Sequence, residues 1–160
     1  SDIKRRYEKY MRDEKTVMVV NPWSSGVIKR MSLPQVYALV TKKSSSKMWD
    51  SVRMFPGDRN IVIIYNDTCK FDGEPLNRIF VTGEGRAFET LEGTFVIVGY
   101  DPTEERYCSL TDEQVKKLLP IFADWSKPVN IMSFGQSHHL SWMKMMANSK
   151  ARSQRDNNGD

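Results

Sequence analysis

The sequence predicts an α+β fold of two small lobes: a helical cluster followed by wrapping strands, and then a compact β-α-β-β domain. In the first 43 residues the apolar residues recur mainly at helical spacing, whereas from residue 49 onward they form short runs bounded by Gly, Pro and Asp. Towards the C-terminus the order is strand, capped helix, strand. We therefore predict a first domain at residues 1–85, a second at residues 90–146 and a basic flexible tail at residues 147–160.

The N-terminal segment predicts an amphipathic helix. Its apolar positions are Ile3, Tyr7, Tyr10 and Met11, and cations fill the other positions, so the apolar stripe needs a surface to cover it. The next apolar run, Val17–Val20, is too short to classify by periodicity.

Two further helices are predicted in the first domain. Asn21-Pro22 pairs a capping residue with proline at the first helical position, and the apolar residues of 27–31 supply a face for that helix. Ser32 caps the next helix, which we expect to end near Lys42-Lys43.

The strands follow. Ile61–Tyr65, Arg78–Gly83 and Thr94–Val98 are aliphatic runs of strand length, and residues 83–86 predict a hinge or tight loop. We place the domain boundary between Gly83 and Gly93.

In the second domain, Thr111-x-x-Gln114 is a capping-box pattern, and Pro120 should end or kink the helix that it opens. Pro128–Gly135 is a further strand with a hairpin turn at Gly135-Gln136. Residues 140–145 then form a returning strand or, alternatively, part of a helix over residues 140–147.

Composition limits the function classes. The chain has 160 residues, of which 39% are hydrophobic and 28% charged, as in a folded domain with a core. No apolar run approaches the ~20 residues of a membrane span. Cys69 and Cys108 lie far apart in sequence, which predicts two reduced thiols. The chain begins at Ser1 rather than Met, so we expect a piece of a longer protein.

Charge is segregated along the chain. Residues 1–59 carry 13 Lys/Arg against 6 Asp/Glu, residues 60–125 carry 6 against 12, and residues 126–160 carry 5 against 2. This division indicates basic surfaces for a polyanion and an acidic middle that would repel one, although solvated faces of ordinary helices and strands are an equal alternative.

The candidate RNA or partner-protein contacts are basic residues around the loop that joins the helices to the strands. They are Arg30, Lys42, Lys43, Lys47, Arg53 and Arg59. Long cationic side chains contact phosphates without reading bases, so we expect salt-sensitive RNA binding. Trp23, Trp49 and Tyr65 could stack on bases, but core packing is favoured for Trp49 and Tyr65.

No catalytic motif is evident. His138 and His139 are adjacent, so on a strand they face opposite sides and do not share one metal. The alternative to a binding module is a small metal-dependent nuclease or hydrolase that uses Asp101, Glu104 and His138, although the loop around Glu104 and Glu105 is better read as solvated. We predict a non-enzymatic fragment with no cofactor and no metal.

A family resemblance rests on three stretches, Gly93–Gly99, Ser109–Leu118 and Lys127–Gln136. In order and spacing they resemble the C-terminal part of the cap-binding basic subunit of an orthomyxovirus RNA polymerase, in a thogotovirus-like or other divergent relative of influenza virus. Ser46-Lys47-Met48 and the strand Asn60–Tyr65 follow the preceding domain of that family.

The resemblance implies a non-catalytic module of a viral RNA-dependent RNA polymerase that works by cap snatching in the host nucleus and is carried in the virion. Its implied partners are viral RNA, other polymerase subunits and an acidic host nuclear phosphoprotein, with no membrane. The basic tail suggests importin-α as a further partner through a weak nuclear import signal, Lys144, Lys150, Arg152 and Arg155. A protein-interaction domain without RNA contact is the remaining alternative.

Overall fold

The computed structural model describes residues 1–41, 51–55, 58–70 and 72–130. The elements, in chain order, are α1 (Asp2–Arg12), β1 (Lys15–Val20), β2 (Val27–Met31), α2 (Leu33–Val40), β3 (Ser51–Phe55), β4 (Asp58–Tyr65), the 3₁₀ helix η1 (Asp67–Lys70), β5 (Leu76–Val81), β6 (Ala87–Glu92), β7 (Phe95–Asp101), β8 (Arg106–Cys108), α3 (Asp112–Ile121) and β9 (Val129–Asn130). The predicted α+β class is confirmed.

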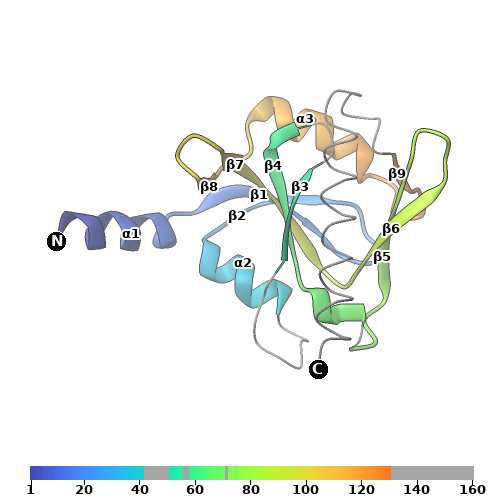
Figure 1. Cartoon of the computed structure of the whole chain (residues 1–160), viewed down its shortest axis with the longest axis horizontal. Helices are drawn as coiled ribbons and strands as arrows, with labels where there is room; N and C mark the ends of the chain where they lie inside the picture. Colours follow the sequence, from blue (N-terminus) through green and yellow to red (C-terminus); the bar gives the residue numbers. More distant parts are fainter. Residues whose placement is uncertain (42–50, 56–57, 71, 131–160) are drawn as a thin grey trace, which may run out of the picture.

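The larger sheet has the strand order β2-β1-β7-β4-β3, with β8 paired to the end of β7 (Figure 1). All of its pairings are antiparallel. β7 is central because it pairs with β1 through Met18↔Ile97 and with β4 through Ile63↔Ile97. The second sheet has the order β6-β5-β9, in which β9 is parallel to β5.

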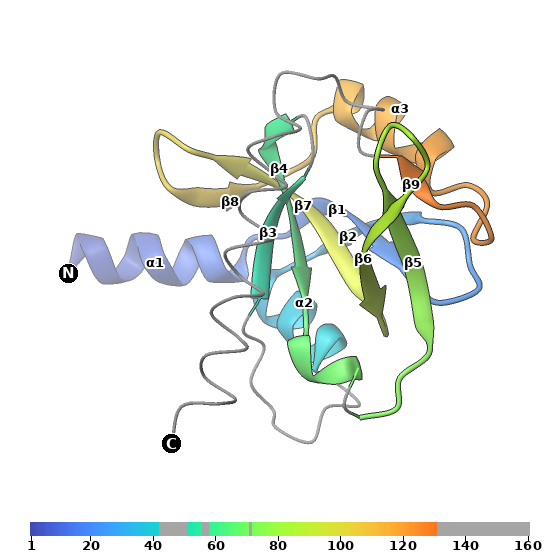
Figure 2. The same ribbon diagram turned by 45° about the vertical axis from the view of Figure 1, so that its right-hand side comes forward.

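The two faces of the larger sheet are both covered, as its aliphatic strands require. α3 and the second sheet lie over one face, and α2 lies over the other (Figures 1 and 2). Alternate residues of each strand point to opposite layers, so Met18 and Ile97 join the layer of Phe122, whereas Val19 and Val96 join the layer of Val36. The result is a three-layer core whose central strand is buried from Phe95 to Gly99.

β7 crosses the predicted domain organisation. It lies in the range predicted for the second domain, yet it is hydrogen-bonded between β1 and β4, which lie in the range of the first. The boundary placed between Gly83 and Gly93 falls in the β5–β6 hairpin, where Gly85 adopts a left-handed φ of 80° in the turn.

The predicted helix caps are confirmed for two helices. Ser32 and Thr111 each accept a hydrogen bond from the backbone N–H three residues later, and Gln35 and Gln114 complete capping boxes. α3 ends at Ile121, one residue after Pro120.

The helix predicted after Asn21-Pro22 is wrong. Trp23 takes a left-handed φ of 60°, which stops helical growth, and residues 27–31 form β2. The pairing of β2 with β1, through Met18↔Ile28, decides this segment. Val27 and Ile28 are β-branched, so their local preference agrees with a strand.

Candidate functional site

α1 projects from one end of the molecule (Figures 1 and 2). The predicted amphipathic helix is confirmed, but none of its residues is buried, and Ile3 and Tyr7 are 80% and 61% exposed. We call this helix the basic arm because all its cations are exposed; they are Lys4, Arg5, Arg6, Lys9 and Arg12.

Tyr10 attaches the basic arm to the body. Its hydroxyl accepts a hydrogen bond from the Tyr107 N–H at 2.8 Å. Lys15 Nζ lies 4.6 Å from the centroid of the Tyr10 ring, and Arg106 Cζ lies 5.1 Å from it. The Lys15 ammonium donates to the carbonyls of Tyr10 and Asp13, at 2.9 and 3.1 Å, and burial lowers its pKa. Cation–π contacts from Lys15 and Arg106 to the Tyr10 ring, together with the hydrogen bonds of Lys15, therefore hold the base of the arm against the body.

Arg30 lies beside this base. It is exposed on the edge strand β2, where Nη1 donates to Thr16 Oγ1 at 3.0 Å and Nη2 donates to the Glu14 carbonyl at 3.2 Å. Glu14 comes two residues after α1 ends, so Arg30 lies next to the base of the arm and its exposed charge adds to the charge of the arm.

The other predicted contacts are not gathered with Arg30. Arg53 belongs to β3, the edge strand opposite β2, and the exposed Arg59 belongs to its neighbour β4. Tyr65 is buried in the core, as expected, whereas Trp23 is 64% exposed. The remaining predicted residues lie outside the described residues: Lys42, Lys43, Lys47, Trp49, Lys144, Lys150, Arg152 and Arg155.

The acidic loop shapes a turn. Asp101 Oδ1 accepts from the backbone N–H groups of Thr103 and Glu104, at 2.9 and 3.3 Å. Across the part of the chain that the structure describes, no three His, Cys, Asp or Glu side chains are grouped so as to hold a metal ion. His138 and His139, which the nuclease alternative needs, fall outside that part.

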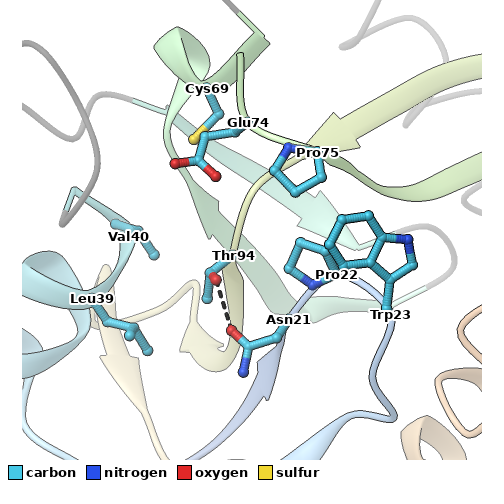
Figure 3. Close-up of a pocket in the computed structure, with 9 residues that line it drawn as sticks. All are labelled: Asn21, Pro22, Trp23, Leu39, Val40, Cys69, Glu74, Pro75 and Thr94. Atoms are coloured by element: carbon cyan, nitrogen blue, oxygen red, sulfur yellow. Dashed lines mark hydrogen bonds between the residues drawn. The ribbon is translucent and has the colours of Figure 1, made fainter. Parts of the chain in front are cut away.

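A pocket of about 440 Å³ lies at the other end of β1. We call it the Trp23 pocket; it is lined by Asn21, Pro22, Trp23, Leu39, Val40, Cys69, Glu74, Pro75 and Thr94 (Figure 3). Asn21 Oδ1 accepts a hydrogen bond from Thr94 Oγ1 at 2.7 Å, which joins the end of β1 to the start of β7.

Gly93 allows close approach at this pocket. Its φ is +74°, and a Cβ there would lie 2.7 Å from Cys69 Sγ, so a larger residue would be strained and would clash. The Gly93 carbonyl accepts from Asn77 Nδ2 at 2.7 Å, and the same amide donates to the Val20 carbonyl at 2.9 Å. Asn77 thus fastens β5 to the end of β1 and to the turn between β6 and β7, beside the pocket.

Arg78 anchors the loop that carries Trp23. It is 1% exposed, and Nη2 donates to the Ser24 carbonyl at 2.6 Å, while Nη1 donates to Asn77 Oδ1 at 2.8 Å. Its guanidinium lies 5.8 Å from the Phe122 ring centroid, and among the described residues its Nε has no hydrogen-bond partner. Burial lowers the pKa of Arg78. Sequence reasoning missed this residue because an arginine in an aliphatic strand carries no local sign of burial.

Within the described residues, no helix is long and apolar enough to cross a membrane. A sequence model of one family, a domain of unknown function (DUF3846), matches residues 11–123, from the last turn of α1 to just beyond α3. No curated protein and no solved structure matches the chain. The family match covers more than half of the sequence and includes the Trp23 pocket and Arg78, so the chain belongs to the DUF3846 family.

Proposed function

We propose that this protein is a non-catalytic binding module that contacts RNA through the basic arm. The observation that carries the proposal is the arm itself, a projecting helix that exposes five cations and buries none of its residues. Arg30 and Arg106 add two exposed cations at its base.

The arm is a short helix with a net positive charge. Its five cations outnumber Asp2 and Glu8, and Arg5 and Lys9 form a like-charge pair four residues apart, while an isolated helix of about 12–15 residues or fewer is marginal in water. Phosphate oxygens would remove this repulsion and release counterions, which favours RNA binding that weakens with salt. The arm needs no base-reading pocket for this, so low sequence preference is expected.

The wider setting stays a prediction. The family description carries no function, so the resemblance to an orthomyxovirus polymerase subunit rests on the sequence alone. In that setting the RNA would be viral, and the acidic host nuclear phosphoprotein would be a second partner, which binds a basic surface of this protein.

A salt titration tests the proposal. The full chain is titrated against a short fluorescent single-stranded RNA between about 50 and 200 mM salt, and log affinity is plotted against log salt. In Arg5→Gln/Arg6→Gln we expect the slope to become shallower by about 0.7 for each phosphate that is no longer neutralised, because each neutralised phosphate of a single strand releases counterions.

The matched control is Lys116→Gln/Lys117→Gln, which removes the same charge from exposed positions of α3. It should leave the slope close to that of the unmodified protein. Equal effects of the two double variants would reject the arm as the RNA-binding surface. RNA cleavage that requires a divalent metal and is abolished in His138→Ala would favour the nuclease alternative, and binding of an acidic protein without RNA would favour the protein-interaction alternative.

A further inference from the structure

Among the described residues that line the Trp23 pocket, one side chain is charged, the Glu74 carboxylate. Among the described residues that line it there is no Lys, Arg or His. Its polar groups are the Glu74 carboxylate, the Asn21 carboxamide and the Thr94 hydroxyl, and Thr94 already donates its proton to Asn21 Oδ1. Since Asn21 Oδ1 already accepts from Thr94, the Glu74 carboxylate is the group of this wall that most favours a ligand with hydrogen-bond donors.

Glu74 is the charged group of the pocket. Its backbone N–H donates to the Cys69 carbonyl at 3.0 Å, and Pro75 follows it, so the backbone that carries the carboxylate is fixed. The side chain is half-buried, and among the described residues none forms an ion pair or hydrogen bond with its carboxylate. In Figure 3 the carboxylate points away from Pro75, towards the space beside Val40 and Thr94. A partly desolvated carboxylate in this position favours a cationic guest.

The rest of the lining suits the stem that would carry such a cation. Leu39, Val40, Pro22 and Pro75 give apolar walls, and Trp23 presents an exposed indole, the side chain that attracts cations best. Trp23 is held there by a left-handed backbone, an uncommon conformation for a bulky residue. Arg78 fixes the loop that carries Trp23 by donating a hydrogen bond to the Ser24 carbonyl.

The charge of the pocket disfavours the ligand proposed for the arm. Within the described part of its lining, the one charged side chain is the Glu74 carboxylate, whereas the arm exposes five cations. A phosphate chain would be repelled at this end of the molecule, whereas a cation would be attracted.

We propose that the Trp23 pocket binds a basic side chain, the ammonium of Lys or the guanidinium of Arg, from a partner protein. The cation pairs with Glu74 and its alkyl stem contacts Leu39 and Val40, while Trp23, beyond Pro75 in Figure 3, borders the same pocket and reports on its occupation. Binding at this pocket is independent of RNA binding, because it uses neither the arm nor Arg30. One side chain alone should bind with a Kd on the order of 1 mM, and a longer peptide more tightly.

The test is an NMR titration of ¹⁵N-labelled full chain, following the indole N–H signals. Trp23→Phe assigns the Trp23 signal by its disappearance. The probes are N-acetyl-lysine methylamide, the corresponding arginine compound, and the norleucine compound, which has an apolar side chain of similar length without the charge. We expect the two basic probes to shift the Trp23 signal with saturation, and the norleucine probe to leave it unchanged.

Glu74→Gln keeps the size of the side chain and removes its charge, and it should weaken binding of the lysine probe by about tenfold, since it removes a charge-assisted hydrogen bond. Glu104→Gln, an exposed carboxylate in the β7–β8 turn, is the matched control and should bind as the unmodified protein does. Equal binding of the norleucine probe, or unchanged affinity in Glu74→Gln, would overturn the proposal. Binding of free 1,5-diaminopentane without binding of the lysine probe would replace the protein partner by a small amine.

Discussion

The two ends of β1 differ in charge and in packing. At its start, Lys15 lies at the base of the basic arm, which buries none of its own residues. At its end, Val20 leads into the Trp23 pocket, where Arg78 and Asn77 tie neighbouring backbones together. Between them, residues 17–20 are at most 2% exposed. A single buried strand thus joins a loosely attached cationic surface to a firmly held pocket whose charged side chain is acidic.

The two ends therefore differ in how closely binding is linked to stability. The pocket end shares its residues with the core, so changes there should cost stability as well as any binding. The arm contributes little to the core, so it can be altered for binding alone. Matched substitutions at the two ends test this difference.

The largest effect is expected from a pair of identical changes. Ile97→Ala, in the centre of β7 at 0% exposure, should lower the free energy of unfolding by about 2–5 kcal/mol through reduced burial and a cavity. Ile3→Ala, at 80% exposure on the arm, should change it by less than about 0.5 kcal/mol. Urea denaturation followed by circular dichroism measures both, and similar costs would mean that the arm is packed against the body in solution.

The second pair of substitutions replaces one buried and one exposed arginine. Arg78→Met should cost about 2–4 kcal/mol, because the carbonyl of Ser24 is deprived of its buried donor and Asn77 of its partner. Arg30→Met removes two exposed hydrogen bonds and should cost less than about 1 kcal/mol. Thermal unfolding gives both values; a stable Arg78→Met would show that the buried guanidinium does not anchor the Trp23 loop.

Helix caps give a third, smaller contrast. Thr111→Ala removes one half of the capping box of α3, whose Leu118 is in the core, and should cost about 1 kcal/mol. Ser1→Ala removes the cap of α1, where Ser1 Oγ accepts from the Lys4 N–H at 3.3 Å, and should leave global stability unchanged. Chemical denaturation of each variant checks this, and an equal decrease for both would couple the arm to the folding unit.

The smallest expected effect is a pH dependence at the arm end. Burial raises the pKa of Tyr107 from its ordinary 10.0 to about 12, so its protonated form is favoured in the folded state. Its contribution to stability is complete below pH 10 and is lost as pH rises from 10 to 12. Tyr107→Phe should therefore lose stability less steeply over this range, as seen in urea midpoints at stepped pH; identical slopes would count against a buried hydroxyl.

Structural features that depend on residues close in sequence were predictable from the sequence, whereas features that depend on pairing between distant segments were not. The caps at Ser32 and Thr111 depend on residues three positions apart, so a single sequence contains the whole pattern. β2 was mistaken for a helix because its pairing with β1 and the left-handed φ of Trp23 are decided by tertiary structure.

The candidate sites follow the same rule. Exposed cations of α1 can be counted from the sequence, but the meeting of Arg30 with Glu14 depends on the β1–β2 hairpin. The Trp23 pocket draws residues from four separate segments, and Arg78 reaches Ser24 across 54 positions. No spacing rule connects residues so far apart.

The central place of β7 has a consequence for how the chain folds. β1 and β4 flank β7 in space, yet β7 is synthesised last of the three strands. Met18 of β1 therefore has no strand partner on this side until Ile97 has been synthesised. During synthesis, β1 and β4 would emerge with their inner edges unpaired, so the sheet can close only after residue 101 has left the ribosome. Folding dominated by such distant pairings is slow, and it exposes aliphatic strand edges to other chains in the meantime. A truncation before residue 95 should therefore aggregate rather than fold.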